Sequence, residues 1–393
     1  MDTFLASIRS RLDTEPSANV VLVTGNESAD LDSIASAITT AFFLSRLDTY
    51  KSSIVVPYVN IPRIDLALRS DVEFVLETND INRDDIFYRD QLPIFEKLAT
   101  KNQLSLFLVD HNKLALSMSS LKTAKVVGII DHHADENLYK DSAKPRRIEI
   151  VGSCASLVAD EFLKNAINSD KAYSSWIQKL ARLLLAPILI DTMDLDPLKK
   201  KVQPLDIAMA NLVFPYIGSG TMQDLHRKVD DARRDTSQLS CYDLLRKDYK
   251  EWTVTQYTTG QDIKIGISSV VGLMAKYIKR DGKEALQQAI DKWAWNQALD
   301  LSFVMLSGDS EEEHGGFQRQ LIVNPVSSSV KDTPSQLEKI SQLELERTSI
   351  VDTDDFVKKG GRAYLQHNNT CSRKQVWPMI EKLLTEPPQS SNL

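Results

Sequence analysis

The sequence has few cysteines, no long apolar run and no excess of basic residues. Its three cysteines, Cys154, Cys241 and Cys371, are odd in number, widely spaced and without a CxxC pair. This pattern argues against a disulfide framework and a thiolate metal site, and it suits a reducing compartment. The longest apolar run, residues 183–190, contains Pro187 and is too short to cross a bilayer.

The first seventeen residues lack the apolar core of a signal peptide, so we expect a cytoplasmic protein. The formal net charge is −7. General attraction to nucleic acid or acidic membranes needs a basic field, so we expect neither partner, and no obligate protein partner is evident. An anionic substrate would therefore need bound cations or a local basic cluster.

The order of apolar patterns predicts the fold class. Short β-branched runs alternate with stretches of helical spacing, which indicates an α/β domain with a mostly parallel sheet covered by helices on both faces. The predicted strands are residues 19–24, 53–59, 105–109, 125–130 and 147–151. The helices predicted near them are residues 33–47, 63–76, 93–99 and 156–166.

A chain of 393 residues usually forms two or three domains. We predict a first domain over residues 1–195, a helical interdomain connection over 196–240 and a second, smaller α/β domain over 241–393. In the second domain we expect strands at 262–271, 298–307 and 319–323, and helices at 284–296, 335–345 and 373–385.

Acidic residues directly follow several of the predicted strands. Asp30 and Asp32 come after the first strand, Asp110 ends another, and Asp131 follows a third. In open α/β sheets, ligands bind beyond the carboxyl ends of the strands. Motifs far apart in the sequence are thus expected to converge on one site.

Each acidic motif alone also has a structural interpretation. Asp30 or Asp32 could simply cap the following helix, because aspartate is a common N-cap residue. Asp110 and Asp191 end apolar segments, where a carboxylate is costly unless it is paired or bound to metal. Loop amides could satisfy Asp110, and Thr192 or the backbone could satisfy Asp191, so these alternatives remain open.

The Asp131-His132-His133 motif favours function more strongly. The chain has only six histidines; two of them are adjacent here, and His111 follows Asp110. Asp131 could accept a ring proton and fix the tautomer of a metal-bound histidine. Such clustering is difficult to explain by packing.

Together the motifs provide enough oxygen and nitrogen donors for two cations bridged by one carboxylate. Carboxylates of this kind suit Mg²⁺ or Mn²⁺. Two such ions stabilise the attacking and leaving oxygens of an in-line displacement and lower the pKa of a bridging water. The sequence therefore predicts phosphoryl-group hydrolysis. The candidate metal ligands are Asp30, Asp32, Asp110, His132 and Asp191.

Two basic clusters near the C-terminus could bind phosphate. Residues 358–362 combine two lysines and an arginine with two glycines, and Arg373 and Lys374 follow Ser372. Glycine lets the backbone approach a phosphate closely, and arginine can form a bidentate pair with its oxygens. The alternative is an ordinary solvated surface.

The motifs resemble those of the DHH phosphoesterase superfamily. They are Asn26…Asp30-x-Asp32, Val109-Asp110-His111-Asn112, Asp131-His132-His133 and Ile190-Asp191-Thr192. Residues 372–376 look like the phosphate-binding signature of the DHHA2 branch, which contains cytosolic exopolyphosphatases, family II inorganic pyrophosphatases and prune-type proteins. Residues 25–30, 152–158 and 245–249 are most similar to the eukaryotic exopolyphosphatases.

The resemblance implies release of orthophosphate from the end of linear polyphosphate, in a cleft between a DHH domain and a smaller DHHA2-like domain. It implies two divalent ions, with Asp110 as the bridging catalytic ligand. It implies that His133 contacts the departing phosphoryl group and assists the leaving group. Arg373 and Lys374 would clamp substrate phosphates.

We expect five residues to bind substrate: Asn26, His111, His133, Arg373 and Lys374. Two of them, Asn26 and His111, bear on specificity. Family II pyrophosphatases carry a histidine where this chain has Asn26, and an amide oxygen suits Mg²⁺ but binds more weakly. This favours an exopolyphosphatase, with weaker occupancy of one metal position. His111 keeps a pyrophosphatase-like feature, so hydrolysis of pyrophosphate, small phosphoesters or nucleotides is the alternative. A catalytically weak phosphate-binding protein is disfavoured by the complete ligand set.

Overall fold

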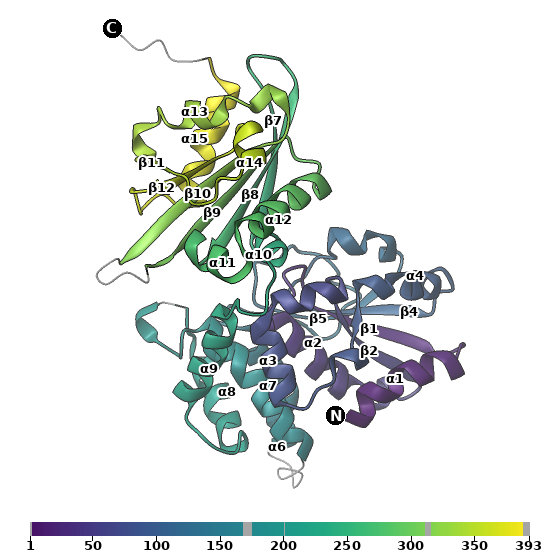
Figure 1. Cartoon of the computed structure of the whole chain (residues 1–393). Coiled ribbons are helices and arrows are strands. Elements are labelled where there is room, and N and C mark those ends of the chain that lie inside the picture. Colours follow the sequence, from purple (N-terminus) through teal and green to yellow (C-terminus); the bar gives the residue numbers. More distant parts are fainter. Residues whose placement is uncertain (1, 168–174, 200, 311–315, 388–393) are drawn as a thin grey trace. The chain divides into compact units, whose positions relative to one another are not determined.

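The computed structural model describes residues 2–167, 175–199, 201–310 and 316–387 (Figure 1). The chain forms two compact units, Met1–Asp235 (unit 1) and Thr236–Leu393 (unit 2). No helix among the described residues is both long enough and apolar enough to cross a membrane.

Unit 1 is built on a sheet with strand order β3-β2-β1-β4-β5-β6, in which every neighbouring pair is parallel. This confirms the predicted mostly parallel sheet. Its central strands are buried on both faces, which explains their continuous apolar runs. The strands are β1 (Asn19–Thr24), β2 (Ser53–Val59), β3 (Phe87–Tyr88), β4 (Leu104–Val109), β5 (Lys125–Asp131) and β6 (Arg146–Ile148).

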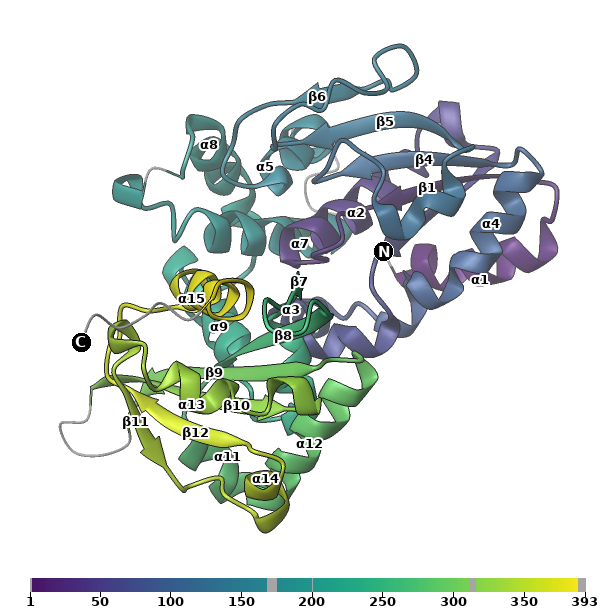
Figure 2. The same ribbon diagram turned by 90° about the horizontal axis from the view of Figure 1, so that it is seen from above.

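Helices connect and cover these strands (Figure 2). The chain passes from β1 to one edge and later crosses back to β4, so right-handed crossovers place α2 and α4 on opposite faces. The helices of this part are α1 (Asp2–Thr14), α2 (Leu31–Leu44), α3 (Ser70–Thr78), α4 (Leu92–Thr100), α5 (Cys154–Val158), α6 (Lys164–Ile167) and α7 (Ser175–Asp191). A π-helical turn, Ala159–Leu163, joins α5 to α6.

Two further helices, α8 (Pro204–Val213) and α9 (Met222–Arg234), complete unit 1. Both pack against α7, and α9 also packs against α3. Most of the segment predicted as an interdomain connection, residues 196–240, thus lies within unit 1.

Unit 2 contains a second sheet, with strand order β11-β12-β10-β9-β8-β7. Only β8 and β9 pair in parallel among its described neighbours. The strands are β7 (Tyr249–Thr255), β8 (Asp262–Val271), β9 (Leu301–Asp309), β10 (Phe317–Pro325), β11 (Leu345–Thr348) and β12 (Arg362–Gln366). The helices are α10 (Cys241–Lys247), α11 (Met274–Asp281), α12 (Lys283–Asn296), α13 (Thr333–Leu337), α14 (Asp354–Lys358) and α15 (Arg373–Thr385). The predicted α/β class of this part is confirmed.

Two predicted helices differ from the observed ones. The helix expected over residues 335–345 ends early: α13 stops at Leu337, and Ile340 has an extended backbone (φ −83°, ψ 93°) before a 3₁₀ turn. The helix expected over residues 63–76 is divided at Arg69, which has non-helical dihedral angles between a 3₁₀ segment, Arg63–Leu68, and α3. In both cases one residue outside the α-helical region breaks a continuous apolar pattern.

Candidate active site

The first acidic motif lies between β1 and α2. Asp30 caps α2, because its carboxylate accepts a hydrogen bond from the Ser33 amide (3.0 Å). Asp32 is buried in the first turn, and its carboxylate accepts hydrogen bonds from the amides of Cys154 (2.6 Å) and Ala155 (2.7 Å), at the start of α5. The two aspartates therefore fix the start of α2 and join it to α5.

Asp110 follows β4 with a positive φ of 60° and is only 2% exposed. Its Oδ2 accepts hydrogen bonds from Ser33 Oγ (2.6 Å) and Asn26 Nδ2 (2.8 Å). Its Oδ1 lies 3.1 Å from His132 Nε2 and 3.6 Å from His133 Nδ1. Asp110 thus connects the first, second and third motifs.

His132 presents one ring nitrogen to the aspartates. Its Nδ1 lies 3.0 Å from the Val151 carbonyl oxygen, and its Nε2 is 3.8 Å from Asp32 Oδ2. Burial by itself would lower the pKa of His132, but the hydrogen bond to Asp110 and the Asp32 charge raise this pKa to about 10. A proton and a cation compete for such a nitrogen, so Nε2 is suitably placed for a metal ligand.

Asp131 is fully buried and orients His133. Its Oδ1 lies 2.8 Å from His133 Nδ1 and accepts hydrogen bonds from the backbone amides of His132 and His133, while Oδ2 accepts one from Asn112. Burial would raise the pKa of Asp131, but the hydrogen bonds from His133 and Asn112 lower it below its usual value. The same contact raises the pKa of His133, whose side chain is 53% exposed.

The carboxylates of the cluster resist ionisation together. Burial, followed by the charge of Asp30, raises the pKa of Asp191 to about 7. Desolvation and the charge of Asp110 raise the pKa of Asp30, and the same causes raise that of Asp32 well above its usual value. Within the described chain, the buried oxygen Asp191 Oδ2 has no hydrogen-bond partner, and Asp110 Oδ1 faces the ring nitrogens of His132 and His133. Hard cations would satisfy all of these groups, so the residues fit a divalent metal centre.

The residues of the four motifs line one cavity of about 460 Å³ in unit 1. Ligand atoms of Asp110, His132 and His133 lie within 4.8 Å of one another. The predicted site residues that line the cavity are Asn26, Asp30, Asp32, Asp110, His132, His133 and Asp191. The convergence expected from the strand order is therefore observed in unit 1.

His111 does not line this cavity. Its Nδ1 lies 2.9 Å from the Val109 carbonyl oxygen, and its Nε2 is buried without a hydrogen-bond partner in the described residues. Burial lowers the pKa of His111, which favours the neutral ring. A direct substrate contact by this residue stays a prediction.

The predicted phosphate-binding residues Arg373 and Lys374 lie in unit 2, at the start of α15. Arg373 donates hydrogen bonds to the Asp248 carboxylate (2.6 Å) and carbonyl (3.0 Å), whereas Lys374 is exposed. In the other basic cluster, Lys359 pairs with Asp355 (2.6 Å). The phosphate-binding role of these residues stays a prediction.

Lys201 and Gln203 also line the cavity, and sequence patterns did not indicate them. Gln203 is the N-cap of α8, and its backbone amide donates a hydrogen bond to Asp206 (2.7 Å). The weak signal that could have found this wall is the Gln203-Pro204-x-Asp206 capping pattern.

Asp206 supports this wall from behind. It is fully buried and also accepts hydrogen bonds from the Gly152 amide (2.8 Å) and Ser156 Oγ (2.6 Å). We expect Asp206→Ala to lower the free energy of unfolding by about 2–3 kcal/mol, because it leaves buried donors unsatisfied. Urea denaturation measures this, with the exposed Asp231→Ala on α9 as the control. Equal stability of the two variants would contradict the supporting role.

Family models and curated relatives match most of the chain. The DHH family, N-terminal domain, matches residues 20–188, and the DHHA2 domain matches residues 227–383. A putative exopolyphosphatase of Schizosaccharomyces pombe is 33% identical over 366 residues, which cover 91% of this chain and 89% of that protein. Human exopolyphosphatase PRUNE1 is 29% identical over 389 residues, or 98% and 80% of the two chains.

A more distant relative is a manganese-dependent inorganic pyrophosphatase of Methanocaldococcus jannaschii. It is 24% identical over 297 residues, covering 74% of this chain and 83% of that protein. The fold and cavity define an α/β protein with a carboxylate–imidazole centre at its strand ends. The chain belongs to the DHH phosphoesterase family, in the branch that carries a DHHA2 domain.

Proposed function

We propose that the protein is a metal-dependent exopolyphosphatase that releases orthophosphate from the ends of linear inorganic polyphosphate. The observation that carries this proposal is the single cavity in which Asp110 joins His132 and His133 beside three further aspartates. Relatives named exopolyphosphatases match nearly the whole chain and support the substrate class.

We propose two divalent ions, Mg²⁺ or Mn²⁺, as the cofactor. The donor set is mainly carboxylate oxygen, which suits these ions, and one relative is named as manganese-dependent. When bound, the ions supply charge neutralisation and an activated water. Asp110 would bridge them. The other ligands would be Asp30, Asp32, His132 and Asp191.

His133 is proposed to act on the departing phosphate. Asp131 holds its Nδ1, so Nε2 is left for the substrate. The hydrogen bond to Asp131 raises the pKa of His133, which favours the protonated ring. This form can donate a proton to the leaving phosphate oxygen. Lys201, at the cavity wall, would attract the polyanion.

Asn26 is proposed to position Asp110. Its Nδ2 donates hydrogen bonds to Asp110 Oδ2 (2.8 Å) and to the Asp110 carbonyl (3.1 Å), and its Oδ1 accepts one from the Ser28 amide (2.8 Å). Both ends of the amide are thus used within the protein. Because the Asn26 amide is occupied in this way, we propose that a metal position beside it is weak. Such a weak position favours an exopolyphosphatase over a pyrophosphatase.

The second candidate function is hydrolysis of inorganic pyrophosphate, which the distant pyrophosphatase relative favours. The test compares phosphate release from long polyphosphate, tripolyphosphate and pyrophosphate at equal concentrations of phosphoanhydride bonds. The proposal predicts that long chains and tripolyphosphate react while pyrophosphate is largely spared. Rapid hydrolysis of pyrophosphate alone would assign the chain to the second function.

Unit 2 is proposed to bind the phosphates of the polyphosphate substrate that are distant from the cleaved end. Lys374→Gln is expected to raise the KM for long polyphosphate about three- to tenfold with kcat little changed, because a distal contact contributes equally to the ground and transition states. Steady-state kinetics measure both constants. Lys382→Gln, on the same helix, is the matched control. An unchanged KM for the Lys374 variant would remove this residue from the proposed path.

We also propose that the protein acts in the cytoplasm. Its three cysteines are buried and free, as suits a reducing compartment.

A further inference from the structure

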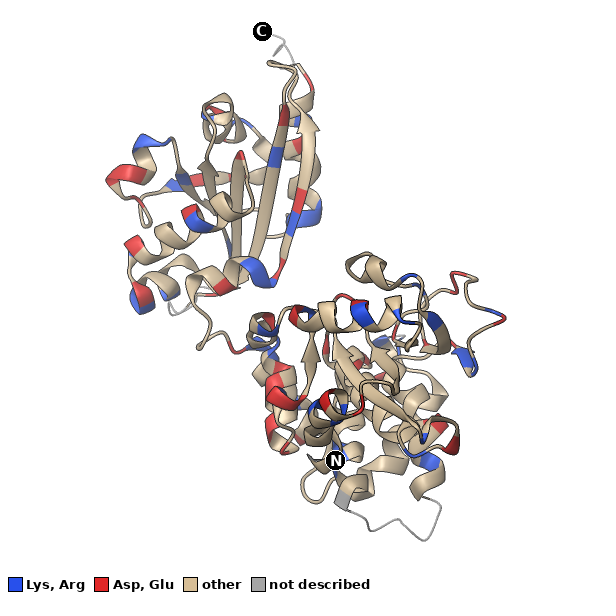
Figure 3. Ribbon diagram, turned by 90° about the vertical axis from the view of Figure 1, so that its right-hand side faces the viewer, with Lys and Arg blue, Asp and Glu red and all other residues tan. Residues whose placement is uncertain are grey.

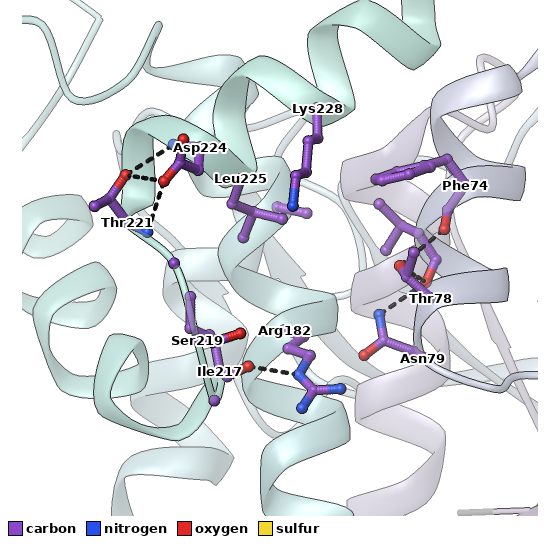
Figure 4. A pocket seen from close by; sticks show the side chains of 14 residues that line it. Phe74, Thr78, Asn79, Arg182, Ile217, Ser219, Thr221, Asp224, Leu225 and Lys228 are labelled. Atoms are coloured by element: carbon purple, nitrogen blue, oxygen red, sulfur yellow. Dashed lines mark hydrogen bonds between the residues drawn. The ribbon is translucent and has the colours of Figure 1, made fainter.

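A second cavity of unit 1, of about 390 Å³, lies between α3, α7 and α9 (Figure 4). It shares no lining residue with the candidate active site. Arg182 enters it from α7 and Lys228 from α9, and residues 217–221 form a glycine-containing loop along one side. Neither the DHH motifs nor the proposed activity uses these residues.

Arg182 is held close to the loop. Arg182 Nε donates a hydrogen bond to the Ile217 carbonyl (2.8 Å). Gly218 has a φ of 96°, and a Cβ atom there would lie 3.3 Å from the Arg182 guanidinium. The loop thus fixes the position of the guanidinium through its Nε atom.

The pocket keeps a positive balance. Its acidic residue, Asp224, accepts hydrogen bonds from the Thr221 amide (3.2 Å) and hydroxyl (2.9 Å) and pairs with Arg227 (3.1 Å). Figure 4 shows the Lys228 side chain extending from α9 toward the space between α9 and α3. Arg182 and Lys228 are therefore available to an anion.

A buried acceptor also points to a ligand. Asn79 is only 2% exposed; its Nδ2 donates to the Val75 carbonyl (2.7 Å), but its Oδ1 has no partner in the described part of the chain. In Figure 4 this oxygen is turned toward Arg182 and the pocket. An unsatisfied buried acceptor is costly, so a ligand with a hydrogen-bond donor would stabilise it.

Apolar residues form the other part of the wall. Phe74 and Leu225 face the same space as the two cations, and Val75 also lines the cavity. A volume of about 390 Å³ is in the range of small-molecule sites. We propose that this pocket binds a small organic phosphate, with its phosphate at Arg182 and Lys228, a donor at Asn79 and an aromatic or apolar part against Phe74.

The pocket is linked to the active site through α7. Arg182 and Ala186 line the pocket, and the same helix ends at Asp191 of the catalytic cavity. Asp191 lies nine positions after Arg182, about two and a half helical turns along α7.

The test is binding of adenosine 5′-monophosphate, measured by isothermal titration calorimetry of the full chain in excess EDTA. Chelation removes binding that depends on active-site metal, so the result does not depend on the proposed activity. We expect saturable binding at one site, weakened about tenfold or more in Lys228→Gln and in Arg182→Gln. Arg233→Gln, an exposed residue of the same helix that lies outside the pocket, is the matched control and should bind as the unchanged chain does.

Orthophosphate and adenosine separate the two halves of the proposed ligand. Both should bind at least about tenfold more weakly than the nucleotide, since each lacks one half of the contacts. Equal binding of adenosine would show that the cations contribute nothing, and equal binding of orthophosphate would exclude the apolar part. Absence of nucleotide binding, or binding unaffected by the Lys228 and Arg182 substitutions, would overturn the proposal. Because Arg182 also holds the loop, the exposed Lys228 provides the variant with the smaller structural effect.

Discussion

Asp110→Asn is expected to lower phosphate release from polyphosphate by about 10³-fold or more, since the proposed bridging position loses its charge. The substitution keeps the shape of the side chain but removes a carboxylate that faces Asn26, Ser33 and His132. Steady-state phosphate release measures the effect. A matched control is Asp141→Asn, an exposed aspartate outside the cavity, which should retain full activity.

The same variant should bind metal more weakly. Calorimetric titration with Mn²⁺ is expected to show tighter binding to the unchanged chain than to Asp110→Asn, because the Asp110 carboxylate lies at the centre of the donor cluster. A variant with normal metal binding and normal turnover would contradict the proposed role of Asp110.

The second large effect separates the two adjacent histidines. His133→Ala is expected to lower kcat by about 10²- to 10³-fold with little change in metal affinity, since His133 is proposed to act on the leaving phosphate. His132→Ala should instead weaken metal binding, because His132 Nε2 faces Asp110 and Asp32. Turnover and Mn²⁺ titrations of both variants measure the two effects.

Both histidines lie close to Asp110. His133 Nδ1 is 3.6 Å from Asp110 Oδ1, and the ligand atoms of Asp110, His132 and His133 are close enough to one another to hold one metal ion. If His133→Ala lost metal to the same extent as His132→Ala, His133 would be a ligand and the proposed division of roles would be wrong.

The parallel sheet could be predicted because its strands are apolar on both faces. The runs at β1, β2, β4 and β5 therefore stand out in the sequence, and the acidic residues after them mark one edge of the sheet. Helix boundaries depend more on single backbone conformations. Ile340 and Arg69 leave the helical region without any glycine or proline at their own positions to signal it.

The cavity could be predicted only where a motif enters it. The aspartates of the four motifs accompany histidines that are rare elsewhere in the sequence, so these residues could be predicted as parts of one site. Lys201 and Gln203 reach the same cavity because α7, α8 and the 151–153 loop pack together, which involves contacts distant in sequence. The role of Asp206 also could not be predicted, because its hydrogen-bond partners Gly152 and Ser156 lie about fifty residues earlier in the sequence.

The alternatives for the acidic residues also proved not to be exclusive. Asp30 caps α2 and lines the cavity at the same time. Asp32 accepts hydrogen bonds from two backbone amides and still faces His132. A carboxylate has two oxygens and several lone pairs, so one side chain can fix the backbone and remain available to a ligand.

The metal dependence of phosphate release from long-chain polyphosphate is the central measurement. A metal-dependent exopolyphosphatase should release phosphate in Mg²⁺ or Mn²⁺, stop in excess EDTA, and recover when the divalent ion is restored above the chelator. Release that persists unchanged in EDTA, or no release from long chains under any of these conditions, would contradict the proposed function.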